Sequence, residues 1–440
     1  CSSLESIEIP DSVTALGSGC FASSGLITIR LSAKVNTIGG GALSAPSLIR
    51  ITADKDNATY TVKNGFLIED GVKIVAFPNG KPFVADETLV LPDGVTNIAS
   101  DVFANNVNVK KVSVPSTIVK IPDGAFRSFK GLEEVTLADG ITEIGNDAFN
   151  GCVSLNKINL PSSLVKIGEN AFNGCVSLAA IDFSTTNPEV VLSEGAFNGA
   201  GLTTLDLSSL NMKTMSDRAF FGCESLIEVK LPKNLERIGN SAFNGCISLE
   251  KVEFGSELTY IDVAAFNGCS ALQSVELPES LTNLMYSAFQ NSGLTSVTLP
   301  KGVTEVGNAV FSGCKQLAEF NAMGELTKIS DNAFYGCSAL KSITIGATVE
   351  NIGKNVFNGC SSLETVTFEN GANPTFGAEA FENCTSLKTI TLPSGITEIS
   401  EKMFSGAGLT EIVLPDAIMT IGDRAFENCA SLTKVTLPAK

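Results

Sequence analysis

One short pattern recurs along nearly the whole chain and decides what it can fold into. An Ala-Phe pair, or a close variant of it, returns every 22 to 25 residues, most often every 23. The anchor residues of the seventeen copies are Phe21, Leu43, Phe103, Phe126, Phe149, Phe172, Phe197, Phe220, Phe243, Phe266, Phe289, Phe311, Phe334, Phe357, Phe381, Phe404 and Phe426. A unit this short cannot bury its own large apolar side chains, so the units must stack on one another.

A single unit shows which local structures the stack contains. Residues 155–160 follow the pattern L-x-x-I-x-L, whose apolar and polar alternation is typical of a strand with one buried face. Pro161 ends this strand because it lacks a backbone donor. Residues 164–168 form a second extended segment that closes on a glycine. Residues 171–175, Ala-Phe-Asn-Gly-Cys, are too few for a full helix and predict a helical or 3-10 turn.

These elements predict a repeat solenoid over residues 1–440, with about 17 units of about 23 residues in one domain. The L-x-x-I-x-L segments should pair as a parallel β-sheet on one face. Short strands and short helical or 3-10 turns should form the rest of each unit.

Composition excludes several classes of function. The chain has 30 Lys and Arg against 47 Asp and Glu, a net charge of −17, which argues against nucleic acid as a partner. It contains no His, so the usual general base and the commonest transition-metal ligand are both missing. No apolar run is long enough for a transmembrane segment. We therefore predict no catalytic residues, no metal, no cofactor and no enzymatic activity.

The recurring motif L-x-x-I-x-L-P-x-x-L-x-x-I-G-x-x-A-F-x-G-C-x-S resembles the BspA-like, or Treponema-type, leucine-rich repeat, and covers everything except part of 54–84. Proteins of this kind are mostly cell-surface or secreted proteins of host-associated bacteria, and some are adhesins. The resemblance implies a surface or secreted recognition protein whose ligand is another protein, such as a host matrix or surface protein. Fold-level similarity does not identify that ligand. We expect a monomer.

Residues 54–84 break the period and carry two apolar runs around Asp70-Gly71, which predicts a β-hairpin insertion. Two interpretations remain open. The hairpin either protrudes as a binding element with Tyr60, Phe66 and Phe77, or lies against the solenoid as a spacer, and we favour the spacer.

Ten of the twelve cysteines stand three residues after the repeat Phe, which indicates a structural position and predicts buried, free thiols. Four units have a small residue and a glycine there instead, and their next Leu comes one residue earlier. These pairs are Ser24-Gly25, Ala200-Gly201, Ser292-Gly293 and Ala407-Gly408. A shorter corner of this kind predicts a tightly packed turn.

The third and fifth residues of each L-x-x-I-x-L segment should point outward and form two columns. Towards the C-terminus these columns hold mainly Ser and Thr. In the middle of the chain they hold Asp182, Asp206, Glu228, Lys230, Lys251, Glu253 and Glu276. This patch either meets a basic protein surface or keeps the face soluble.

Three functions remain open for such a chain. The leading hypothesis is protein recognition through the charged columns or the hairpin. The alternatives are a structural spacer that presents another domain, and a glycan-binding surface. The absence of Trp and the presence of only four Tyr disfavour the glycan-binding alternative. The chain starts and stops within repeats and shows no polar capping unit, so we expect it to be part of a longer protein.

Overall fold

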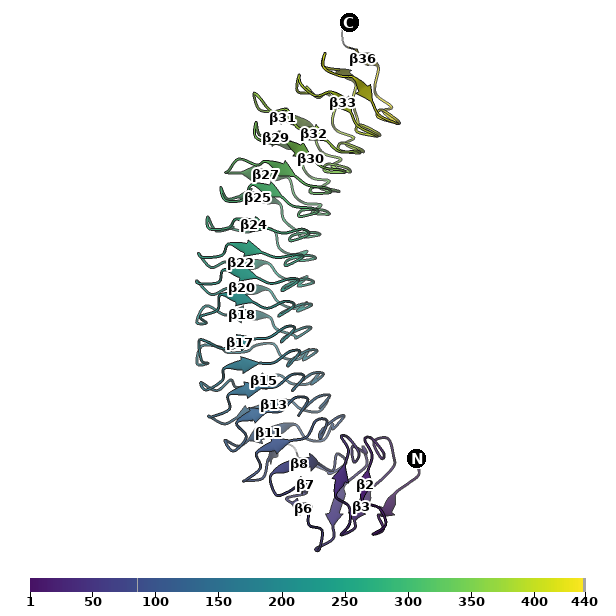
Figure 1. The fold of residues 1–440 in the computed structure, drawn as a ribbon, viewed down its shortest axis with the longest axis vertical. Helices are drawn as coiled ribbons and strands as arrows, with labels where there is room; N and C mark the ends of the chain where they lie inside the picture. Colours follow the sequence, from purple (N-terminus) through teal and green to yellow (C-terminus); the bar gives the residue numbers. More distant parts are fainter. Residues whose placement is uncertain (85, 438–440) are drawn as a thin grey trace. The chain divides into compact units, whose positions relative to one another are not determined.

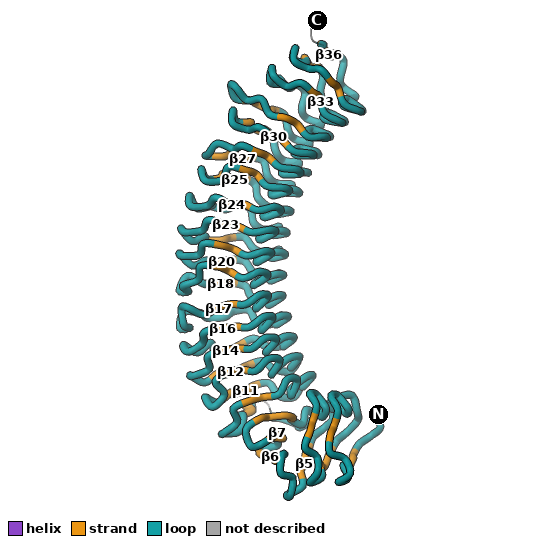
Figure 2. The backbone as a smooth tube through the Cα atoms, viewed as in Figure 1, coloured by secondary structure: helices purple, strands orange, loops and turns teal. Residues whose placement is uncertain are grey.

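The computed structural model describes residues 1–84 and 86–437, which form stacked coils of strands and tight turns (Figure 1). Most coils contribute a strand of two to four residues on one side and a two-residue strand on another, with loops between them, and equivalent strands of successive coils pair in several separate sheets (Figure 2). The predicted solenoid with parallel pairing is confirmed. No helix occurs among the described residues, so the predicted helical or 3-10 turns are tight turns instead.

Backbone proximity groups the coils into two units, Cys1–Met212 with Arg218–Leu226 and Lys213–Asp217 with Ile227–Lys440. In the first unit the longer strands are β1 (Ser6–Glu8), β3 (Thr28–Leu31), β5 (Arg50–Ala53), β9 (Thr88–Val90), β11 (Lys111–Val114), β13 (Glu134–Leu137), β15 (Lys157–Ile158) and β18 (Thr204–Asp206). Its short strands are β2 (Ala15–Leu16), β4 (Thr37–Ile38), β10 (Asn97–Ile98), β12 (Lys120–Ile121), β14 (Glu143–Ile144), β16 (Lys166–Ile167) and β17 (Val191–Leu192).

In the second unit the longer strands are β20 (Glu228–Lys230), β22 (Lys251–Glu253), β25 (Ser296–Leu299), β27 (Glu319–Ala322), β29 (Ser342–Ile345), β31 (Thr365–Phe368), β34 (Glu411–Val413) and β36 (Lys434–Thr436). Its short strands are β19 (Thr214–Met215), β21 (Arg237–Ile238), β23 (Tyr260–Ile261), β24 (Asn283–Leu284), β26 (Glu305–Val306), β28 (Lys328–Ile329), β30 (Asn351–Ile352), β32 (Thr375–Phe376), β33 (Glu398–Ile399) and β35 (Thr420–Ile421).

The corner around each repeat Phe explains why no helix forms. Asp147 and Gly151 flank Phe149 with φ values of 53° and 74°, in the left-handed region that ends a right-handed helix. The amide of Phe149 donates to the Ala171 carbonyl of the following coil at 2.8 Å. The amide of Cys152 donates within its own coil, to the Phe149 carbonyl at 3.0 Å. Successive amides thus alternate between a turn within the coil and a bond to the next coil, and both sets of backbone N–H groups have a hydrogen-bond acceptor.

The core is a set of ladders in which equivalent side chains from successive coils stack. The rings of Phe126, Phe149, Phe172 and Phe197 are buried, with centroids 5.1 to 5.3 Å apart and nearly parallel planes. Such offset stacking adds to the free energy gained from apolar burial. Each coil therefore depends on its neighbours for stability.

The repeat cysteines form a second ladder with a specific hydrogen bond. The thiol of Cys152 donates to the Phe126 carbonyl of the preceding coil at 3.0 Å, and that of Cys175 donates to the Phe149 carbonyl at 3.2 Å. The cysteines are reduced and are not joined in disulfides. Burial raises the pKa of Cys152 and of Cys223 to about 12, so these groups stay protonated and unreactive near neutral pH.

The shorter corners need glycine because of contact with the preceding coil. A Cβ added to Gly201 would lie 2.0 Å from the Val176 carbonyl oxygen, and one added to Gly408 would lie 2.0 Å from that of Thr385. Only a residue without a side chain fits this approach. The tight corner predicted from the sequence is confirmed.

The insertion is a three-stranded antiparallel sheet of β6 (Tyr60–Lys63), β7 (Phe66–Glu69) and β8 (Lys73–Ala76). Strand β8 pairs in parallel with β10, so the insertion joins the short-strand ladder. The side chains of Tyr60, Phe66 and Phe77 are 1 %, 0 % and 1 % exposed, and the Phe66 ring contacts Phe77 and Phe103. The structure thus buries the three residues named for the protruding alternative: Phe66 and Phe77 extend the phenylalanine core, and Tyr60 packs in an aliphatic cluster.

Candidate functional site

The charged columns of the second unit lie on the exposed side of β20 and β22. The register aligns Glu228 with Lys251 and Lys230 with Glu253, and the central Val229 and Val252 point into the core. Lys251 forms ion pairs with Glu228 at 2.9 Å and with Glu253 at 2.5 Å. Hydrogen bonds from Lys251 to these two carboxylates raise its pKa. The charges of β20 and β22 are therefore paired with one another, and exposed ion pairs of this kind contribute little to the free energy of folding.

The other acidic residues have different roles. Asp182 and Asp206 belong to the first unit and cap local turns, accepting the backbone N–H groups of Ser184 and Ser208 at 2.8 and 2.9 Å. Hydrogen bonds from Ser184 lower the pKa of Asp182. Glu276 belongs to the second unit and is exposed, in a coil where residues 273–276 form no strand. The two aspartates therefore have a structural role as well as an exposed charge.

The hydroxyl columns also lie where the sequence placed them. Strands β29 and β31 align Ser342 with Thr365 and Thr344 with Thr367, and all four side chains are exposed. Short hydroxyl side chains offer a partner little apolar area.

Sequence reasoning considered only the longer strands and missed a second surface, the face of the short strands in the second unit. The register aligns Arg237 of β21 with Tyr260 of β23 and Asn283 of β24. The guanidinium of Arg237 lies 4.3 Å from the centre of the Tyr260 ring and forms an ion pair with Asp262. A cation stacked on an aromatic ring and fixed by a carboxylate is a rigid arrangement of the residue types that dominate binding surfaces.

Three of the four tyrosines of the chain lie in this unit, at positions 260, 286 and 335. Tyr286 and Tyr335 are 53 % and 47 % exposed. Placed within the repeat, Tyr260 and Tyr286 lie in or next to the short strands of successive coils, whereas Tyr335 follows the repeat residue Phe334. That signal could have identified the short-strand face.

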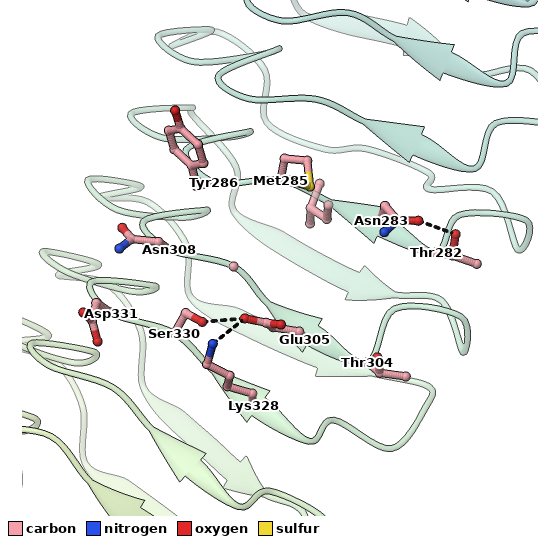
Figure 3. A pocket seen from close by; sticks show the side chains of 12 residues that line it. Thr282, Asn283, Met285, Tyr286, Thr304, Glu305, Asn308, Lys328, Ser330 and Asp331 are labelled. Carbon is pink, nitrogen blue, oxygen red and sulfur yellow. Dashed lines mark hydrogen bonds and ion pairs between the residues drawn. The ribbon is translucent and has the colours of Figure 1, made fainter.

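Beside Tyr286 the short-strand face contains an open hollow of about 490 Å³. It is lined by Thr282, Asn283, Leu284, Met285, Tyr286, Thr304, Glu305, Gly307, Asn308, Lys328, Ser330 and Asp331. Figure 3 shows Tyr286 and Asn308 on one side of the hollow and Thr282 and Thr304 on the other.

Between these sides Glu305 accepts a hydrogen bond from Ser330 at 2.7 Å and forms an ion pair with Lys328 at 3.0 Å (Figure 3). Burial opposes ionisation of Glu305, but these two partners outweigh it and lower its pKa. The carboxylate is thus ionised and its charge is matched within the hollow.

The hollow coincides with an interruption of the short-strand ladder. Strands β24 and β26 belong to different sheets, whereas β23 pairs with β24 and β26 pairs with β28. The rings of Phe289 and Phe311 in these coils are 6.2 Å apart, against 5.3 Å for the preceding pair and 5.6 Å for the next.

The interruption also coincides with a departure from the repeat. Met285-Tyr286 occupies positions that hold glycine and Asn or Asp in coils such as Gly239-Asn240. A Cβ on Gly239 would lie 2.6 Å from the Met215 carbonyl oxygen of the coil before. A Cβ on Gly307, the equivalent residue of the β26 coil, would lie 3.1 Å from its nearest neighbour, the Leu284 carbonyl oxygen. The two coils at the hollow are therefore less closely packed than regular ones.

Among residues 1–84 and 86–437, no three or more Asp, Glu and Cys side chains converge as metal ligands would. No helix in this part of the chain has the length and apolarity needed to cross a bilayer.

Comparison with known proteins relates the repeat to a defined family. The family model described as "BspA type Leucine rich repeat region" matches six copies, over residues 1–82, 96–209, 190–318, 285–408 and 327–440. A leucine-rich repeat protein of Bacteroides ovatus is 30 % identical over 86 % of this chain and 92 % of its own, with a TM-score of 0.69. A leucine rich cell surface protein of Faecalibacterium prausnitzii is 23 % identical over 83 % of this chain and 88 % of its own, with a TM-score of 0.44. No curated protein matches the chain in sequence.

Proposed function

Because this chain belongs to the BspA-type leucine-rich repeat family, we propose that it is a non-enzymatic scaffold that recognises another protein. A location at the cell surface or outside the cell, and an adhesin-like role towards a host matrix or surface protein, accord with what the family resemblance implies. The chain acts as a monomer in this proposal.

The observation that carries the proposal is that buried and exposed side chains alternate within the longer strands. In β22 the central Val252 is buried, whereas Lys251 and Glu253 on either side are exposed. Core packing depends on Val252, and strand pairing depends on backbone hydrogen bonds. The outward side chains can therefore vary to suit a partner without loss of the fold. Rows of such positions on successive coils offer a broad surface to a protein.

The proposed contact residues are the charged ones of the two outward columns. They are Asp182 and Asp206 in the first unit and Glu228, Lys230, Lys251, Glu253 and Glu276 in the second. Their excess of carboxylates suits a partner with a basic surface, since complementary potentials increase the association rate. The buried Tyr60, Phe66 and Phe77 no longer belong to the proposed surface.

The experiment measures binding of the chain to immobilised fibronectin, laminin and collagen by biolayer interferometry. The test variant combines Asp206→Asn, Glu228→Gln, Glu253→Gln and Glu276→Gln. We expect at least tenfold weaker binding to whichever protein binds, with a smaller dependence on salt. Its urea midpoint should change little, because exposed ion pairs contribute about 0–1 kcal/mol each.

The matched control changes Thr344, Thr367 and Thr391 to Ser, which alters three outward positions without altering charge. We expect unchanged binding. Binding that survives the four charge changes but is lost in the threonine variant contradicts the assignment of the surface. Failure of all three matrix proteins to bind favours the alternative function, a spacer that presents another domain.

A further inference from the structure

We infer that the hollow beside Tyr286 is a binding subsite for a neutral saccharide. It lies on the short-strand face and shares no residue with the proposed protein-binding columns. The inference therefore does not depend on the proposed function, and either can fail without the other.

The hollow has the size of a small-ligand site. Its volume of about 490 Å³ lies within the range of about 300–1,000 Å³ that is usual for such sites. That volume holds a mono- or disaccharide. The hollow is open to solvent, which suits a sugar ring that keeps part of its hydration and continues into a longer glycan.

The charges in the hollow leave no excess of positive charge for an anion. Glu305 is paired with Lys328, and the Asp331 carboxylate accepts the backbone N–H of Lys354 at 2.8 Å. A phosphate or sulfate would meet two carboxylates and one ammonium group. The charged groups therefore favour an uncharged ligand.

The remaining polar groups match the hydroxyls of a sugar. The side chains of Asn283 and Asn308 and the hydroxyl of Thr304 are neutral and line opposite sides of the space (Figure 3). An amide or hydroxyl can both donate and accept hydrogen bonds, as each sugar hydroxyl does. Neutral groups of this kind specify a polyol without the desolvation penalty of a charge.

Tyr286 supplies the apolar part of the site. Tyr286 lines the hollow and is 53 % exposed, so part of its side chain is accessible to a ligand. The C–H face of a pyranose ring packs on an aromatic face in the way that apolar groups do, and tyrosine adds a hydroxyl that can bond to the ligand. Tyr260 lies one coil away in register with Asn283, where Arg237 packs on its ring.

The chain contains no Trp, which allows a direct test. The variant Tyr286→Trp places the only indole of the protein at the hollow. The matched control is Tyr335→Trp, which replaces another exposed tyrosine of the same unit that does not line the hollow. Each is titrated with lactose, N-acetylglucosamine disaccharide, mannose disaccharide and, as a charged comparison, sialyllactose, while the indole emission is recorded.

We expect a saturable change of emission with at least one neutral disaccharide in Tyr286→Trp and none in Tyr335→Trp. Adding Asn308→Ala to the first variant should weaken that response at least tenfold, with an unchanged urea midpoint. Any one of three results overturns the inference: no neutral disaccharide gives a response, both variants respond alike, or only sialyllactose gives a response.

Discussion

The short corner at Gly201 allows the close packing of coils to be tested with one methyl group. In Gly201→Ala the new Cβ would lie 2.0 Å from the Val176 carbonyl oxygen, where ordinary contact requires about 3.5 Å. The corner must therefore move away from the preceding coil. This movement stretches the hydrogen bond of 3.1 Å from the Gly201 amide to the Cys175 carbonyl.

The expected destabilisation follows from three contributions. Overpacking of a fitted site costs about 1–3 kcal/mol, and loss of a backbone hydrogen bond costs about 1 kcal/mol. The lower entropy of unfolded alanine offsets about 0.4–1 kcal/mol of this. We therefore expect the free energy of unfolding to fall by about 2 kcal/mol.

The control is Gly17→Ala, in the same unit, where an added Cβ meets no atom within 4 Å. Urea unfolding followed by circular dichroism gives the free energies. Native-state hydrogen exchange at Gly201 and Thr203, whose amides both donate to the preceding coil, localises the effect. Equal stabilities for Gly201→Ala and Gly17→Ala, or unchanged exchange at Gly201, would refute the packing argument.

Two further predictions concern the core. The first is that the free energy of unfolding falls as pH rises from 9 towards 12. Unfolded thiols lose their protons near pH 9, whereas Cys152 and Cys223 keep theirs to about pH 12, so between these values the unfolded state binds fewer protons than the folded state. A urea midpoint that stays constant over this range contradicts the prediction. Phe66→Ala should destabilise the first unit by about 3–5 kcal/mol, as measured by urea unfolding, because the ring is fully buried, and a loss below 1 kcal/mol would show that the insertion is not part of the core.

The repeating part of the fold could be predicted from the sequence because each position recurs many times. The alternation in residues such as 155–160 predicted the buried face of each strand, and the position of the repeat cysteines predicted the burial of nine of the ten, Cys429 being only partly buried. The tight corners at Gly201 and Gly408 followed from a one-residue change in spacing. Because every copy of the repeat shows the same pattern, an ambiguous residue in one copy is resolved by the equivalent residues of the others.

The non-repeating parts were harder because each occurs once. The apolar run 66–68 fits either a protruding hairpin or a segment packed on the solenoid, and its pairing with β8 and edge-to-face contact with Phe103 place it in the core. The turn around Phe149 was expected to be a helical or 3-10 turn because the segment is too short for a full helix, and the left-handed φ of Asp147, a residue other than glycine, could not be foreseen. The hollow at Tyr286 coincides with the single bulky pair Met285-Tyr286 and with a wider spacing between coils, and the pair alone does not reveal that spacing.

The central claim, recognition through the outward columns of the longer strands, is tested most directly by lysine footprinting of the chain bound to its matrix protein. Lys230 and Lys251 lie in these columns, whereas Lys213 and Lys328 lie outside them, next to β19 and on β28. Acetylation read by mass spectrometry compares each lysine with itself in the free chain. We predict that binding protects Lys230 and Lys251 while Lys213 and Lys328 remain reactive; protection of Lys213 and Lys328 with continued reactivity of Lys230 and Lys251 would contradict the claim.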